Sequence, residues 1–200
     1  RDAQESRGLG DVYKRQNPDT LSFITELLPS EDKVPLRNTI YTLSCVLLDR
    51  SDCDRKLAEK FKTEYGRTHN FVHKFAQVVL PEEFDLLGTV YQSFLTEGVK
   101  NSTGSYYTER SVAQELLDSL EAKPGASFLD PCCGSGTFLI LAQEMGLKIC
   151  GMDSDPIAVM IAKANLILSG AKEYPDVRVI DFVNRWKSER RRFDFAATNP

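Results

Sequence analysis

The chain has 200 residues, of which 42% are hydrophobic, 10% aromatic and 27% charged, and its formal net charge is −4. This composition is typical of an ordinary globular core and excludes a wholly disordered chain. The chain has no run of about 18 apolar residues that could span a membrane, and its negative charge gives no bulk attraction to nucleic acid. Five scattered cysteines without a C-x-x-C pair favour neither a disulfide framework nor a zinc site. We therefore expect a cytoplasmic protein without a membrane partner.

The two ends of the chain are unlike the rest. Residues 1–16 show neither helical nor strand periodicity, and residues 6–16 match the translation of a common sequencing adapter. We expect residues 1–16 not to be native and exclude them from the fold prediction. At the other end, the chain stops at Pro200, directly after an apolar run at residues 193–197. We expect the chain to be a fragment.

The region from residue 17 to residue 103 has helical periodicity. Apolar residues recur at steps of three and four, which predicts helices near residues 20–28, 36–47, 57–79 and 86–95, with a loop over 100–107. His69 and His73 have the spacing of metal ligands on a helix, but no glutamate lies between them and no third ligand is near. We therefore expect surface histidines and no metal site.

From residue 104 onwards, predicted strands and helices alternate. Strands are expected at 127–130, 148–153, 177–180 and 193–198, and helices at 110–120, 137–145 and 155–169. This alternation is typical of an α/β fold with a parallel, doubly wound sheet. Ligands of such sheets bind beyond the carboxyl ends of the strands.

The residues at those strand ends suggest an adenosine cofactor. Asp153 follows Gly134, the first glycine of the loop that also holds Gly136, by 19 positions. This spacing suits a carboxylate that accepts hydrogen bonds from ribose hydroxyls. A dinucleotide loop needs a third glycine, where this chain has Leu139. A cofactor without phosphate, whose amino-acid end pairs with Asp130 and loop amides, fits better. S-adenosylmethionine meets that description.

Residues 130–138 read D-P-C-C-G-S-G-T-F, which resembles the D-P-x-C-G-S-G-T-F motif of N6-adenine DNA methyltransferases. Residues 104–108 resemble the preceding G-x-x-Y-T-P element, with Glu109 in place of its proline. Residues 151–156 and 181–182 resemble the next two motifs, and residues 193–200 resemble the start of the catalytic N-P-P-[YF] motif, cut after its first proline. The motif order is similar to that of type I modification subunits and type IIG enzymes of restriction-modification systems. The D-L-L-G-T-V-Y stretch at 85–91 also resembles a helix found ahead of these motifs.

This resemblance implies a Rossmann-like methyltransferase sheet, truncated after strand four, with strand order three, two, one, four, preceded by an α-helical region. It divides the chain into a helical part over 17–103 and an incomplete methyltransferase domain over 104–200. It also implies roles for single residues. For the cofactor, Tyr107, Thr108 and Asp130 hold the methionine part, and Gly134 and Gly136 allow close backbone approach. Asp153 binds the ribose with Asp155 nearby, and Asp181 binds the adenine of the cofactor. Asn199 with Pro200 forms the catalytic pair that holds a flipped target adenine.

The activity implied is methyl transfer from S-adenosylmethionine to the N6 amino group of adenine in a specific DNA sequence. We expect double-stranded DNA to be bound through a missing C-terminal recognition domain or a separate specificity subunit, with restriction subunits as further partners. Because the catalytic motif is incomplete, we expect the chain as given to be inactive.

Several alternatives stay open at this point. Asp130 and Asp153 alone are compatible with helix caps, and Asp181 with a turn residue. The basic residues at 185–192 suit a solvated segment better than a DNA contact. An N-P-P-[YF] enzyme acting on a protein glutamine amide or on ribosomal RNA is the nearest alternative function. A nicotinamide oxidoreductase and a non-enzymatic assembly surface are further ones.

Overall fold

A computed structural model describes residues 36–66, 85–94, 108–185 and 192–200. The adapter-like residues 1–16, the predicted helices near 20–28 and beyond residue 66, His69, His73 and the loop over 100–107 lie outside these ranges. Among the helices of the described ranges, none is both long and apolar enough to cross a membrane.

The described strands form one parallel sheet. It consists of β1 (Ser127–Asp130), β2 (Lys148–Asp153), β3 (Val177–Val179) and β4 (Phe195–Ala196), in the order β3-β2-β1-β4. This order and the α/β class confirm the prediction from the motifs. In the register, Asp130 lies beside Gly151, and Gly151 lies beside Val177, so the carboxyl ends of β1 and β2 meet at one edge.

The fourth strand is shorter than the predicted 193–198. It pairs with β1 at Phe195 and Ala196, and the amide of Asp194 also donates to the carbonyl of Ser127 at 3.1 Å. Asp194 bonds Ser127 through its side chain as well. Its carboxylate accepts hydrogen bonds from the amide and the hydroxyl of Ser127, at 2.8 and 2.7 Å. These bonds hold the pKa of Asp194 below its ordinary value. The side chain thus ties the start of β4 to the start of β1.

Three helices cover one face of the sheet: α8 (Arg110–Asp118), α9 (Thr137–Glu144) and α10 (Pro156–Leu168). Together with Phe128 of β1 they form a continuous buried cluster. The next residue of β1, Leu129, belongs to a separate buried cluster with Cys150 and Met152, because successive side chains of a strand point to opposite faces. The short helix α11 (Phe182–Arg185) follows β3.

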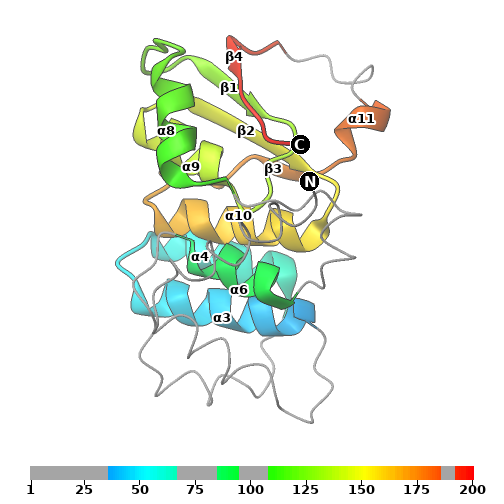
Figure 1. The fold of residues 1–200 in the computed structure, drawn as a ribbon. Helices are drawn as coiled ribbons and strands as arrows, with labels where there is room; N and C mark the ends of the chain where they lie inside the picture. The colour runs from blue at the N-terminus through cyan, green and yellow to red at the C-terminus, as the bar shows by residue number, and fades with distance from the viewer. Residues whose placement is uncertain (1–35, 67–84, 95–107, 186–191) are drawn as a thin grey trace.

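The helical region packs on the outer side of α10. Helices α3 (Leu36–Arg50), α4 (Arg55–Tyr65) and α6 (Leu86–Phe94) form a layer below α10, which separates them from the sheet (Figure 1). Helix α10 reads P-I-A-V-M-I-A-K-A-N-L-I-L and is buried along most of its length. A helix that is apolar all round needs cover on both sides, which explains why the sheet and the helical layer share it.

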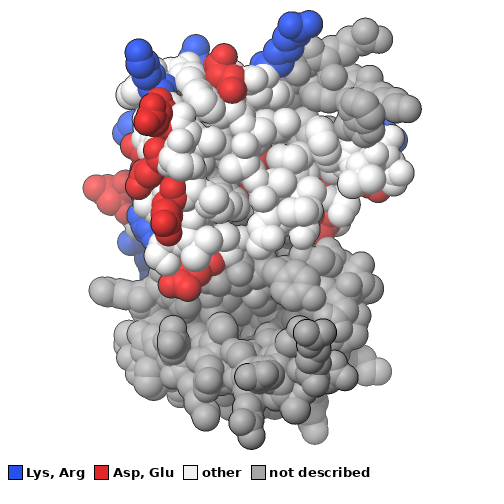
Figure 2. Space-filling model, turned by 45° about the horizontal axis from the view of Figure 1, so that its top comes forward, with Lys and Arg blue, Asp and Glu red and all other residues white. Residues whose placement is uncertain are grey.

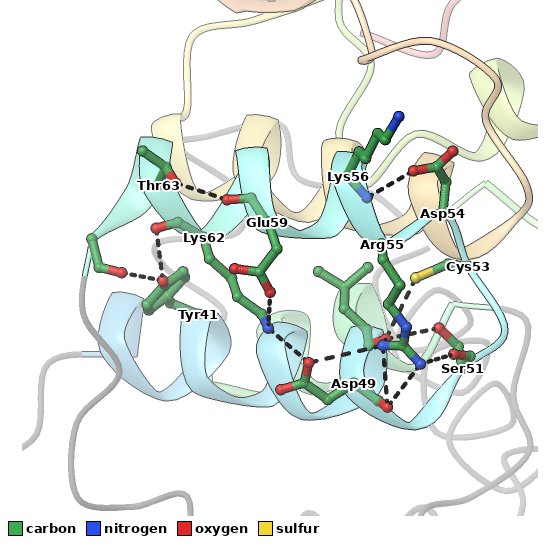
Figure 3. Close-up of polar contacts among 12 residues, drawn as sticks. Tyr41, Asp49, Ser51, Cys53, Asp54, Arg55, Lys56, Glu59, Lys62 and Thr63 are labelled. Carbon is green, nitrogen blue, oxygen red and sulfur yellow. Dashed lines mark hydrogen bonds and ion pairs between the residues drawn. The ribbon is translucent and has the colours of Figure 1, made fainter.

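Polar contacts hold α3 against α4 (Figure 3). The guanidinium of Arg55 donates to the carbonyls of Leu48 and Ser51, each at 3.0 Å. Lys62 forms ion pairs with Asp49 at 2.7 Å and Glu59 at 2.8 Å. The arginine thereby satisfies one carbonyl in the last turn of α3 and one directly after the helix, where carbonyls have no partner within the helix.

One ion pair joins α4 to α10. The ammonium of Lys163, a residue of α10 that is only 8% exposed, lies 2.6 Å from Oε1 of Glu64. The hydroxyl of Tyr174 donates to the other oxygen of Glu64. These two bonds hold the pKa of Glu64 below its ordinary value, although burial alone acts in the other direction.

Candidate cofactor cleft

A cleft lies at the carboxyl ends of the strands, and segments far apart in the sequence line it. Among its lining residues are seven of those predicted from the motifs: Thr108, Asp130, Gly134, Asp153, Asp181, Asn199 and Pro200. Tyr107 lies outside the described residues. The parallel arrangement brings these side chains together because each strand ends at the same edge of the sheet.

Asp130, the last residue of β1, is 1% exposed. Its Oδ1 accepts a hydrogen bond from the amide of Cys132 at 3.2 Å. Burial raises the pKa of this carboxyl to about 7, although bonds from Thr198 and Cys132 act against the shift and Asp153 adds to it. A buried carboxylate without a cation is costly, so this group favours a positively charged ligand.

The two glycines of the loop serve different purposes. Gly134 has a φ of +51° and a Cβ at this position would meet no atom within 4 Å, so its backbone borders open space in the cleft. Gly136 has a φ of +96° and a Cβ there would lie 3.2 Å from the Cβ of Ala162. Gly136 is the N-cap of α9 and does not line the cleft as Gly134 does. The first glycine leaves room for a ligand, and the second allows α9 to pack on α10.

Asp153 joins the ends of β1 and β2. Its Oδ2 accepts from the amide of Gly134 at 2.8 Å, and its Oδ1 from the amide of Asp155 at 2.9 Å. Burial raises its pKa despite these two bonds. A carboxylate has about four acceptor positions, so Asp153 keeps acceptor capacity for a ligand hydroxyl.

Asp155 lies beside the cleft but is not one of its lining residues. It is the N-cap of α10, and its Oδ1 accepts from the amide of Ile157 at 2.8 Å. Its Oδ2 accepts from the hydroxyl of Tyr91 at 2.5 Å. Of the acidic residues for which a helix cap was an alternative, Asp130 and Asp153 cap no helix here, whereas their neighbour Asp155 does.

Asp181 lies at the far side of the cleft, after β3. Its oxygens accept from the amide of Asn184 at 3.1 Å and from the side-chain nitrogen of Asn184 at 2.5 Å. The neighbouring cleft residues Ile180, Phe182 and Val183 are apolar. This end of the cleft therefore combines an acceptor with apolar surface, which suits a heterocycle with an exocyclic amine.

Asn199 and Thr108 meet at the opposite end. The side-chain nitrogen of Asn199 lies 3.2 Å from the hydroxyl oxygen of Thr108. Elsewhere in the cleft lining, burial raises the pKa of the Cys133 thiol well above its ordinary value, and the pKa of Cys132 is raised as well. Both thiols are therefore protonated at neutral pH, which gives no nucleophile.

Three cleft residues come from outside the predicted methyltransferase region. Gly88, Tyr91 and Gln92 of α6 form part of the lining, and the site prediction did not include them. The signal in the sequence is the D-L-L-G-T-V-Y stretch at 85–91, whose resemblance predicts a helix and assigns no site residue. Within the described ranges no group of three or more potential metal-ligating side chains occurs.

The fold and this cleft define an α/β protein of the methyltransferase type. The structure is similar to a modification subunit ascribed to a type I restriction enzyme from Vibrio vulnificus YJ016, with a TM-score of 0.51 and 20% identity over 75% of this chain and 37% of that chain. This similarity concerns the fold.

The family model of the N-6 DNA methylases matches residues 82–200. The chain belongs to this family. Among curated relatives, the type I restriction enzyme MjaIX methylase subunit of Methanocaldococcus jannaschii is 35% identical over 144 residues, which are 64% of this chain and 25% of that protein. Ribosomal protein L11 methyltransferase of Burkholderia cenocepacia is 43% identical over 72 residues, 36% of this chain and 23% of that protein. The chain thus spans about a quarter of the length of these relatives.

Proposed function

We propose that the chain provides the S-adenosylmethionine site and the start of the catalytic loop of an N6-adenine DNA methyltransferase in a restriction-modification system. One observation carries the proposal: Asp130, Asp153 and Asp181 line one cleft together with Asn199 and Thr108. The cleft offers a buried carboxyl for a cation, acceptors for a ribose and an open backbone at Gly134, which fits this cofactor.

The three aspartates of the cleft each have a chemical task in this proposal. Asp130 binds the ammonium of the methionine part, Asp153 accepts from the ribose hydroxyls, and Asp181 accepts from the adenine amino group. S-adenosylmethionine, when bound, supplies an electrophilic methyl group on a sulfonium. A nicotinamide cofactor is disfavoured, because Leu139 is buried in the core of α9 where a dinucleotide loop has its third glycine.

Asn199 acts on the target base. Its side-chain oxygen and the carbonyl of Pro200 accept hydrogen bonds from the exocyclic amine of an adenine that has left the base stack. Two acceptors on this amine draw its nitrogen towards tetrahedral geometry, so that its lone pair becomes available. No strong base is required for this task.

The partners follow from the family and from the surface. In Figure 2, acidic side chains gather on the side where α8 lies, whereas the Lys and Arg side chains in view are scattered. No broad basic surface forms in this view of the described residues. We therefore place sequence-specific contact with double-stranded DNA in a recognition domain or a specificity subunit, and restriction subunits among the partners of a cytoplasmic complex.

A protein glutamine amide or ribosomal RNA is the alternative substrate. A planar amide poses the same chemical problem as an aromatic amine, so Asn199 suits both. The similarity to a ribosomal protein L11 methyltransferase favours a protein substrate, but it covers 36% of the chain. The N-6 DNA methylase model covers residues 82–200, and this greater extent favours DNA.

Two experiments test the proposal. Calorimetric titration of the chain should show binding of S-adenosylmethionine but not of NAD, and Asp153→Ala should lose it, while Asp52→Ala at an exposed position between α3 and α4 should not. Binding of NAD in preference would overturn the cofactor assignment. In the protein that contains this chain, labelled methyl should pass to adenine of duplex DNA and not to ribosomal protein or RNA, and Asn199→Ala should abolish the transfer.

A further inference from the structure

Helix α6 contacts the glycine loop through a buried side-chain pair. Asp85, which precedes α6, is 1% exposed, and Asn165 of α10 is 6% exposed. The side-chain nitrogen of Asn165 donates to Oδ1 of Asp85 at 2.7 Å and to the carbonyl of Ser135 at 3.0 Å. Asn165 therefore links the start of α6 to the loop between Gly134 and Gly136.

This link determines the orientation of one peptide plane. The peptide between Ser135 and Gly136 has its carbonyl held by Asn165 and its amide held by the carbonyl of Cys133, at 2.8 Å. Gly136 has a φ of +96°, and a glycine beside a peptide bond gives that peptide freedom to rotate. With both of its polar groups bonded, the peptide is restrained in one orientation.

Gly88 accommodates the buried carboxylate. The amide of Gly88 donates to Oδ1 of Asp85 at 2.7 Å, and a Cβ at position 88 would lie 2.2 Å from Oδ2 of Asp85. No other residue type fits here without displacing the carboxylate. In the D-L-L-G part of the stretch at 85–91, Asp85 is therefore the acceptor and Gly88 is the residue that leaves room for its carboxylate.

A second chain of hydrogen bonds reaches the same loop from Tyr91. The hydroxyl of Tyr91 donates to Asp155, the amide of Asp155 donates to Asp153, and Asp153 accepts from the amide of Gly134. Both series of hydrogen bonds start at the 85–91 stretch, one at Asp85 and one at Tyr91. They end at adjacent residues of the glycine loop, Ser135 and Gly134. The stretch at 85–91 therefore supports the loop at two points.

We propose that Asp85 and Asn165 are positioning residues that hold the glycine loop in its cofactor-binding conformation, so that α6 is a functional part of the cofactor site. The proposal rests on the proposed S-adenosylmethionine site. A loop already held in its bound conformation loses less conformational entropy on binding. The boundary proposed between residues 103 and 104 then separates two sequence regions that share one site.

Calorimetric titration of the whole chain with S-adenosylmethionine tests this role. We expect Asn165→Ala and Asp85→Ala each to weaken binding about five- to tenfold. The first removes the donor to the Ser135 carbonyl, and the second removes the carboxylate that positions this donor. We expect Asp85→Asn to bind within about threefold of the unchanged chain, since its Oδ1 can still accept both hydrogen bonds. Circular dichroism at the titration temperature establishes that each variant is folded.

A core variant separates positioning from stability. Val90 of α6 is 0% exposed and belongs to the cluster between the helical layer and α10. Val90→Ala should lower the unfolding midpoint as Asn165→Ala does, but leave the affinity unchanged. Equal weakening by Val90→Ala, or unchanged binding by Asn165→Ala, would overturn the positioning role alone. If the chain without substitutions is folded but does not bind S-adenosylmethionine, the proposed function is overturned, and this inference with it.

Discussion

The side-chain nitrogen of Asn199 donates a hydrogen bond to the hydroxyl of Thr108, 3.2 Å away and 91 positions earlier in the chain. An amide that donates through its nitrogen presents its oxygen in the opposite direction. In the proposed reaction this oxygen is the acceptor for the target amine. In that proposal Thr108 has a second task beside cofactor binding, which is to orient the side-chain amide of Asn199.

Thr108→Val should release this amide. We expect the side-chain amide protons of Asn199 to exchange with water faster in the valine variant, because the hydroxyl acceptor is gone, and Thr108→Ser to retain the protection. Nuclear magnetic resonance of the labelled chain measures both. Thr63→Val is the control, because Thr63 bonds only the Glu59 carbonyl within α4. Equal exchange in the valine and serine variants would contradict the orienting bond.

Asp130→Asn should stabilise the chain without cofactor while it weakens cofactor binding at least tenfold. The folded-state pKa of about 7 is higher than the value near 3.9 of an unfolded chain. The folded state therefore binds the proton more tightly, and the free energy of unfolding decreases as pH rises from about 4 to about 7. At pH 8 we expect the asparagine variant to gain on the order of 1 to 3 kcal/mol. Urea unfolding measures this gain, and a loss of stability would contradict the buried charge.

Binding of S-adenosylmethionine should depend on pH through the same group. Below pH of about 7 the Asp130 carboxyl must release a proton before it can pair with an ammonium, so the affinity should fall up to about tenfold per pH unit. Above this range the affinity should level off. Calorimetry between pH 5.5 and 8 measures the profile, and Asp130→Asn should flatten it. A pH-independent affinity in the unchanged chain would show that Asp130 does not bind the cation.

A comparison of Gly134→Ala with Gly170→Ala should distinguish the backbone strain of an alanine at positive φ from the loss of space for the ligand. Both glycines have positive φ, +51° and +92°, and neither Cβ would meet an atom within 4 Å. Each alanine should therefore lower the free energy of unfolding by about 1 to 2 kcal/mol. Only Gly134 borders the cleft, so only its alanine variant should weaken cofactor binding. Weakening by both variants to the same degree would argue against close approach at Gly134.

Substitution of the two partners of the ion pair between α4 and α10, Glu64 and Lys163, should lower the free energy of unfolding by different amounts. Glu64→Gln leaves the buried ammonium of Lys163 without its charged partner and should lower the free energy of unfolding by about 1 to 2 kcal/mol. Lys163→Met replaces the buried charge with apolar volume and should cost less. Because the pKa of Glu64 is lowered in the folded state, its contribution is present at neutral pH and is lost as pH falls below about 4. Urea midpoints at pH 7 compare the variants, and a larger cost for Lys163→Met would contradict this account.

Much of the site could be predicted because the pattern of strand, loop and helix that specifies an α/β unit lies within a short stretch of sequence. A strand ending in Asp130, a glycine loop and a second strand ending in Asp153 specify a right-handed parallel unit, and parallel strands bring their carboxyl ends to one edge. The predicted strand order is the observed one. The observed β4 is shorter than the predicted 193–198, and the contact of the Asp194 side chain with Ser127 at its start is not visible in periodicity.

The sequence by itself determined the fold class, the glycine loop and the family, since these depend on residue types at short spacing. Only the tertiary structure decided that α6 lines the cleft, that Asn165 links Asp85 to Ser135, and that Asp155 caps α10. The pair Asp85 and Asn165 is separated by 80 positions, and the packing of one apolar helix between two layers brings it together. Burial likewise decides the protonation of Asp130, because the cost of a buried charge depends on everything that surrounds it and not on its neighbours in the chain.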